Sequence, residues 1–227
     1  MNPVYLVVSP AFRRKLTRLM IKALLLVVQP FETWERIFRA QRSLNFVLWR
    51  FLIPLLLLAS LAEGYGLHRW CKWQQDALRL KRFEVGEAVV FEVVQVVLGL
   101  MMVFIAAWLL KLLGETFHGR HSMQQTFTVA AYGLGPMFLM RVFDAVPALS
   151  PWITWPVGIC LSVGVLYQGI PRVMMPDPPH AFGLYLMSSV LLIVLTGLTR
   201  FVTAWYLQGY FQPVETIIRD AGRALFS

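Results

Sequence analysis

Charged residues are scarce in this chain. They make up 15% of the sequence, whereas hydrophobic residues make up 58%. A soluble domain typically carries about 25% charged residues and about 45–50% apolar ones. Several apolar runs approach the length of about 20 residues that crosses a bilayer as a helix. The shortage of charge therefore argues against a water-soluble fold and predicts an all-α membrane protein.

Cysteines and catalytic motifs are also few or lacking. Cys71 and Cys160 have no CxxC spacing, and Cys160 lies within an apolar run. This pattern argues against a disulfide framework and against redox or metal chemistry. No GxxxxGK[ST], GxSxG, HExxH or GxGxxG pattern occurs in the sequence. We therefore expect a non-enzymatic protein that uses no cofactor and no metal.

Acidic residues are outnumbered, 12 against 21 lysines and arginines, which gives a net charge of +9. Much of the excess falls in residues 1–43, where a cytoplasmic membrane anchor would place it. The apolar part of this segment, Leu19–Val28, is too short to span a bilayer. We therefore expect residues 1–43 to form a basic amphipathic segment with a helix that lies in the membrane interface. We expect it to bind anionic lipid headgroups or a protein partner, not nucleic acid. The residues expected to make this contact are Arg13, Arg14, Lys15, Arg18 and Lys22.

Apolar runs after residue 43 predict one bundle of five transmembrane helices over residues 44–210, followed by a short tail, 211–227. The expected spans are 46–66, 88–112, 126–147, 151–172 and 181–208. The third carries Gly133, Gly135 and Pro136 in its middle. Such residues need neighbouring helices to satisfy the freed backbone groups, so we expect the third span at the centre of the bundle. The longest connection, 67–87, predicts a brief interfacial helix.

Lysines and arginines outside these spans are more numerous on the side that carries the N-terminus. By the positive-inside rule, the N-terminus is expected in the cytoplasm and the C-terminus in the periplasm.

A charged residue inside a span costs about 2.5–3.5 kcal/mol on insertion scales, and five such residues lie away from the cytoplasmic ends of the predicted spans. The topology places all of them in the outer half of the membrane. We expect a buried cluster in which Arg200 pairs with Glu92 or Asp144. Its members are Glu63, Glu92, Arg141, Asp144 and Arg200. One interpretation is an ion, proton or headgroup site; the other, which we favour, is a structural clamp.

Two cytoplasmic connections carry further polar residues. His118 and His121 are three residues apart, but no adequate set of further ligands accompanies them, so we interpret them as polar loop residues. The second connection, between the fourth and fifth spans, is rich in proline and predicts a stiff turn. Together the two connections predict a small docking surface, formed by His118, Arg120, His121, Arg172, Asp177 and His180.

Three segments, taken in order, resemble a known family. They are PFETWERI (Pro30–Ile37), GETFHGRHSMQQTFTVAAYGLGPM (Gly114–Met137) and VLYQGIPRVMMPDPPHAFGLY (Val165–Tyr185). Over about residues 25–209 the chain resembles the bacterial branch of the Yip (Ypt-interacting protein) domain family. The resemblance implies a compact five-helix bundle with a cytoplasmic N-terminus. Eukaryotic relatives are associated with Rab-type GTPases and vesicle traffic, but the chain lacks their DLYGP-like element, so a GTPase partner is not carried over.

Together these features predict a polytopic protein of the bacterial inner membrane that binds partners or organises the membrane. The expected partners are anionic lipid headgroups, a protein at the cytoplasmic face, and further copies of the chain or other subunits. The alternative function is a small transporter or channel subunit that uses the charged intramembrane cluster.

Overall fold

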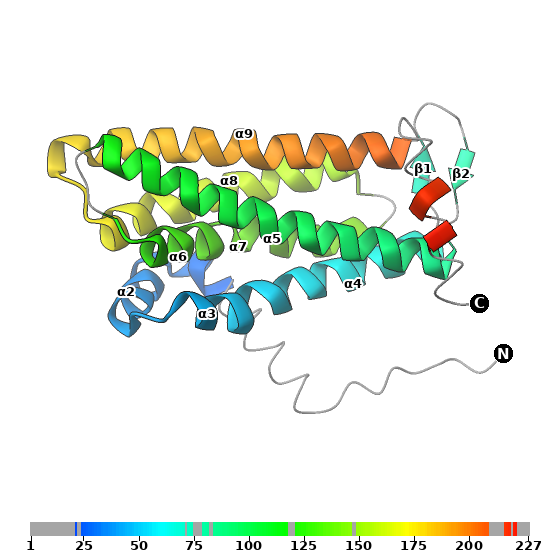
Figure 1. The fold of residues 1–227 in the computed structure, drawn as a ribbon, viewed down its shortest axis with the longest axis horizontal. Helices are drawn as coiled ribbons and strands as arrows, with labels where there is room; N and C mark the ends of the chain where they lie inside the picture. Colours follow the sequence, from blue (N-terminus) through cyan, green and yellow to red (C-terminus); the bar gives the residue numbers. More distant parts are fainter. Residues whose placement is uncertain are drawn as a thin grey trace.

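In the computed structural model of the chain, the described residues are 21, 24–70, 72–74, 79–81, 84–117, 121–146, 149–208, 216–218 and 220–221. Five helices within these ranges are long and apolar enough to cross a membrane, which confirms the predicted fold class. Figure 1 shows the long helices running along the long axis of the molecule. The candidate spans are Leu44–Arg69, Val85–Thr116, Met123–Ala145, Trp152–Met174 and Pro178–Tyr206.

Several spans are built from more than one helical segment. In chain order the helical elements are α2 (Pro30–Ala40), α3 (Leu44–Val47), the π-helix η1 (Leu48–Leu52), α4 (Ile53–Trp70), α5 (Val85–Thr116), α6 (Met123–Gly133), α7 (Gly135–Met140), the 3-10 helix η2 (Arg141–Ala145), α8 (Pro151–Met174), the 3-10 turn η3 (Pro178–His180) and α9 (Ala181–Gln208). We call the end of the bundle that carries α2 and the start of α6 the α2 end. The opposite end carries two short strands and is the hairpin end (Figure 1).

The connection between the first two spans differs from the predicted interfacial helix. α4 continues to Trp70, and then β1 (Lys72–Gln74) pairs antiparallel with β2 (Arg79–Lys81). Trp73 faces Leu80 in this register. Residues 71–81 carry mixed polar and apolar side chains, a pattern compatible with either an interfacial helix or a pair of short strands. The hydrophobic periodicity alone therefore does not distinguish these two structures.

The third span lies at the centre of the bundle, as expected. In the third span, 72% of the most apolar stretch is buried inside the protein. In the other four spans, the buried share of the corresponding stretch is 28–44%. The helix breaks at Leu134, between α6 and α7, next to Pro136. The backbone N–H of Met137 finds its acceptor outside the helix, at the Oγ of Ser162 on α8, 3.2 Å away. A neighbouring helix thus satisfies the group that the break frees.

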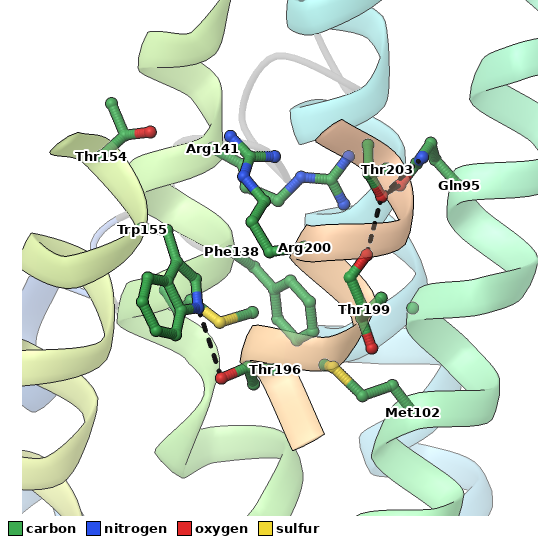
Figure 2. A pocket seen from close by; sticks show the side chains of 12 residues that line it. Gln95, Met102, Phe138, Arg141, Thr154, Trp155, Thr196, Thr199, Arg200 and Thr203 are labelled. Carbon is green, nitrogen blue, oxygen red and sulfur yellow. Dashed lines mark hydrogen bonds between the residues drawn. The ribbon is translucent and has the colours of Figure 1, made fainter. Parts of the chain in front are cut away.

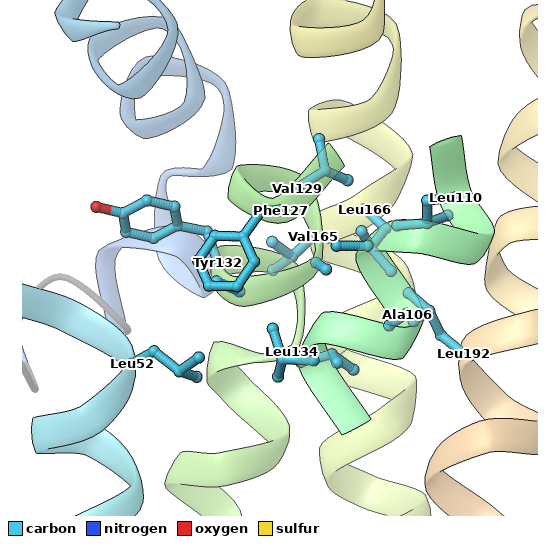
Figure 3. Close-up of a cluster of buried hydrophobic side chains, with 14 of the residues drawn as sticks. Leu52, Ala106, Leu110, Phe127, Val129, Tyr132, Leu134, Val165, Leu166 and Leu192 are labelled. Carbon is cyan, nitrogen blue, oxygen red and sulfur yellow. The ribbon is translucent and has the colours of Figure 1, made fainter. Parts of the chain in front are cut away.

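The core around this span consists of aliphatic and aromatic side chains (Figure 3). Phe127, Leu134 and Leu166 are fully buried. In lipid, an apolar side chain gains little by leaving its surroundings, so helix association depends on close packing. Gly133 shows how close this packing is, because a Cβ atom there would lie 2.4 Å from the Leu166 side chain.

α2 is fixed to the bundle by one tryptophan. Trp34 is fully buried, and its Nε1 donates a hydrogen bond to the backbone oxygen of Val165 on α8, at 3.0 Å. Its ring packs edge-on to Tyr132, with centroids 6.3 Å apart. On α8 the ring lies against Gly169, where an added Cβ would come within 2.4 Å of it. An amphipathic helix outside the spans is thereby held in one position on the bundle.

This contact predicts that Gly169→Ala destabilises the protein. The new methyl group overlaps the Trp34 ring, and overpacking of this kind costs about 1–3 kcal/mol. Gly164→Ala, on the same helix, is the matched control because a Cβ there meets nothing within 4 Å. Thermal unfolding of the detergent-solubilised chain should show a lower midpoint for Gly169→Ala only. Equal midpoints for the two variants would show that Trp34 does not hold α2 in this way.

Candidate functional site

Two ion pairs lie inside the bundle toward the hairpin end. Arg141 Nη2 donates to Glu63 Oε2 at 2.8 Å, and Arg200 Nη2 donates to Asp144 Oδ2 at 2.5 Å. Both carboxylate side chains are fully buried, and the arginine side chains are only 13% and 8% exposed. Of the two partners considered for Arg200, the structure selects Asp144.

Close backbone contact brings these residues together. At Gly66 on α4, an added Cβ would lie 2.4 Å from the carbonyl oxygen of Ala145 in η2. The lack of a side chain therefore lets η2 lie directly against α4, near Glu63. A second glycine of α4, Gly64, leaves room for the side chain of Glu92, whose Cγ would lie 2.9 Å from an added Cβ. Glu92 is also within electrostatic reach of Arg141.

The network extends to α8 through a hydroxyl group. Thr154 Oγ1 donates to Asp144 Oδ1 at 2.5 Å, so both carboxylate oxygens of Asp144 carry a hydrogen bond. Thr154 is 4% exposed, and the side chain of Asp144 is fully buried. The ion pairs and this bond connect α4, η2, α8 and α9. All five charged residues of the predicted cluster are thus found in one region of the bundle.

A cavity of about 40 Å³ adjoins both arginines. Figure 2 shows the side chains of Arg141 and Arg200 beside the threonines of α9 and Gln95 of α5. Gln95 Nε2 donates to Thr203 Oγ1 at 3.1 Å across the two helices. This space exceeds the ~10–15 Å³ that one water needs, and polar side chains form part of its wall.

The threonines of α9 on the cavity wall donate their hydroxyl protons within their own helix, so their oxygens remain as hydrogen-bond acceptors. Thr196, Thr199 and Thr203 each donate a hydroxyl hydrogen bond to a backbone oxygen one turn earlier, at 2.7–2.9 Å. Trp155 Nε1 in turn donates to Thr196 Oγ1 at 3.4 Å. Donors on the guanidinium groups and acceptors on the hydroxyl groups together suit bound water.

The arginines at the α2 end have different surroundings. On α2, Arg36 and Arg39 form ion pairs one turn away with Glu32 and Glu35. Arg42, Arg50 and Arg172 have no carboxylate partner among the described residues. Two of them stack on aromatic rings. The guanidinium carbon of Arg172 lies 4.0 Å from the ring centroid of Phe31, and the guanidinium carbon of Arg42 lies 4.7 Å from the ring centroid of Phe46.

His121 lies at the α2 end, just before the third span. It is only 7% exposed, and a Cβ on Gly114 of α5 would lie 2.1 Å from its ring. Burial lowers the pKa of His121 below its ordinary value of 6.5, and the charge of Glu115 opposes that shift only in part. The imidazole is therefore neutral at pH 7 and serves here as a packing group. Within the described ranges, no three metal-ligating residues come together.

Of the other residues of the predicted docking surface, Arg172 lies in the last turn of α8, and Asp177 and His180 lie between α8 and α9. Asp177 is exposed and precedes η3. His180 packs against Phe117 at the end of α5, with ring centroids 6.2 Å apart. Arg172 Nη1 donates to the backbone oxygen of Gln168 at 2.8 Å. The predicted lipid-contact residues Arg13, Arg14, Lys15, Arg18 and Lys22, together with His118 and Arg120, lie outside the described residues.

Sequence reasoning missed several polar residues that the structure brings together. Thr196, Thr199 and Thr203 follow helical spacing and share one face of α9, a signal that was available in the sequence. Gln95 lies in an otherwise apolar run and was likewise visible. The contact of Trp34 with Gly169 had no such signal, because their positions are far apart in the chain.

The fold defines a polytopic α-helical membrane protein with several spanning helices. A sequence model of the Yip1 domain matches residues 24–200, which is most of the chain. The chain therefore belongs to the Yip1 domain family, and the resemblance seen in its sequence is confirmed at family level. Neither the comparison with curated proteins nor the comparison with solved structures found a match.

The buried pair predicts a strongly non-additive response to mutation. Arg200→Gln leaves Asp144 buried without its counter-charge, and removing one partner of a buried pair costs about 3–5 kcal/mol. The double variant Arg200→Gln with Asp144→Asn should cost clearly less than the sum of the two single variants, because neither charge is left uncompensated. Unfolding free energies in mixed micelles measure these differences.

Arg39→Gln provides the control for this cycle, because its pair with Glu35 is exposed. Its cost should stay below about 1 kcal/mol. If Arg200→Gln cost no more than this control, the buried pair would not stabilise the bundle.

Proposed function

We propose that this Yip1-family protein is a non-enzymatic membrane organiser that engages anionic lipid and partner proteins through its α2 end. The observation that carries the proposal is the unequal pairing of arginines at the two ends of the bundle. Arg141 and Arg200 are neutralised by carboxylates inside the protein. Arg42, Arg50 and Arg172, at the α2 end, are available to external anions, and each basic residue near an anionic surface contributes ~1 kcal/mol.

The apolar surface next to these arginines supports the same proposal. Residues 24–28 are helical and lead into α2. Leu24 is 49% exposed, Val28 67% and Phe31 56%. Exposed apolar side chains beside basic ones are typical of a helix that lies in the interface and inserts its apolar side among lipids. Because Trp34 fixes α2 to the bundle, this surface has one defined orientation on the protein.

The charged cluster serves as a clamp in this proposal, and its members Glu63, Glu92, Arg141, Asp144 and Arg200 hold the hairpin ends of the helices together. A transporter or channel has less support, because both guanidinium groups are bonded to carboxylates and the adjoining cavity has room for little more than water.

The proposed orientation places the α2 end in the cytoplasm of a bacterial cell, with the protein in the inner membrane. The end of α8 and the turn that follows it, with Arg172, Asp177 and His180, would then lie on the cytoplasmic side. This surface would contact a protein partner or further subunits. The basic residues before residue 23 would add to the attraction for anionic lipid.

The proposal predicts that anionic lipid gathers around the full-length protein. In proteoliposomes at low salt, energy transfer from tryptophan should be greater to dansyl-labelled phosphatidylglycerol than to dansyl-labelled phosphatidylcholine. High salt should reduce the difference, because it screens exposed charges. Arg50→Gln with Arg172→Gln should reduce it more than Arg69→Gln, at the hairpin end of α4. Equal transfer to the two lipids at low salt would contradict the proposal.

A further inference from the structure

A second cavity, of about 200 Å³, lies at the α2 end between α2, α6 and α8. It is smaller than the ~300–1,000 Å³ of pockets for drug-sized ligands, so its size suits one small group. Of the described residues that line it, only Arg42 is charged. Polar side chains of Ser122, Gln124, Gln125 and Thr128 form the wall on the α6 side.

The position of Arg42 is fixed by the chain around it. Gln41, the residue before it, adopts a left-handed conformation with φ 38° and ends α2. The backbone oxygen of Arg42 accepts a hydrogen bond from Gln124 Nε2 at 2.9 Å, which links the α2–α3 connection to α6. The guanidinium group meanwhile has an aromatic neighbour, Phe46, but no carboxylate among the described residues. It therefore retains its hydrogen-bond donors for another acceptor.

This cavity and the one beside Arg141 and Arg200 differ in charge balance. At the hairpin end, Arg141 and Arg200 adjoin a cavity but are each bonded to a carboxylate. That site has no surplus positive charge to attract an anion. The described residues that line the α2-end cavity include one arginine and no acidic residue. An anion in this cavity would supply the counter-charge that Arg42 lacks.

We propose that this cavity binds the phosphate group of an anionic membrane lipid. Arg42 would form charge-assisted hydrogen bonds with the phosphate oxygens. The inference deepens the proposed function and rests on it, since it assigns the preference for anionic lipid to one defined site.

The position of the cavity favours a lipid over free phosphate. Ser122 caps the first helix of the third span, so the cavity lies where hydrocarbon gives way to headgroups. Its other walls are apolar and include Ile37, Phe38 and Val173. A phospholipid carries a phosphate group that Arg42 can bind and an apolar part that can contact the apolar walls. Inorganic phosphate has no apolar part to make the second contact.

Arg42→Gln tests the site in the full-length chain. In detergent micelles, native mass spectrometry would follow titration with short-chain phosphatidylglycerol, with phosphatidylcholine and inorganic phosphate in separate arms. A hydrogen bond between charged groups in a cavity predicts a loss of affinity for phosphatidylglycerol of about tenfold or more. Arg50→Gln is the matched control, because Arg50 also lacks a carboxylate but does not line the cavity; it should lose about fivefold at most. Arg42→Lys keeps the charge and should recover most of the affinity.

Thr128→Leu tests the space independently of charge. It places an apolar side chain in the polar wall and should weaken phosphatidylglycerol binding while Arg42 is intact. Thermal unfolding of each variant would show that the fold is retained. The cavity site would be overturned if the wild type binds phosphatidylglycerol but Arg42→Gln and Arg50→Gln lose equal affinity for it. That result would leave the proposed function standing. Absence of any preference over phosphatidylcholine in the wild type would defeat both. Inorganic phosphate that binds as tightly as the lipid, in an Arg42-dependent way, would overturn the assignment to lipid.

Discussion

A charge inside the hydrocarbon layer must be neutralised within the protein, because lipid tails cannot solvate it. Here Arg141 is paired with Glu63 and Arg200 with Asp144, and both acids are fully buried. The groups come from α4, η2 and α9, elements that are distant in the chain. Satisfying these charges therefore fixes how the first, third and fifth spans meet at the hairpin end. Thr154 adds the fourth span to the same network.

Packing at the other end follows a different rule. Apolar helices gain little from burying apolar surface when the alternative is lipid, so they associate through shape and hydrogen bonds. The indole of Trp34 provides both, because it fits over Gly169 and bonds to the oxygen of Val165. His121 likewise fits against Gly114. At this end Arg42, Arg50 and Arg172 have no carboxylate partner among the described residues.

The sequence predicts the bundle well because long apolar runs and helix-breaking residues are local signals. The five spans and the central place of the third, with its break next to Pro136, follow from them. The clustering of charges follows from topology, since each charge lies near the same end of its span. The choice of Asp144 by Arg200 could not be predicted, because Glu92 lies at a similar depth. That choice depends on the backbone contact at Gly66, which sets where η2 lies. For residues 71–81 local periodicity is ambiguous, and the structure has the paired strands Lys72–Gln74 and Arg79–Lys81 where a helix was predicted.

We propose that the buried charges bind one another and hold the bundle together without forming a path for ions. Proton and ion flux in proteoliposomes that contain the full-length chain tests it most directly. The structure predicts no flux above that of protein-free vesicles at any imposed gradient. A sustained flux that Asp144→Asn abolishes, while the variant remains folded in the membrane, would contradict the claim.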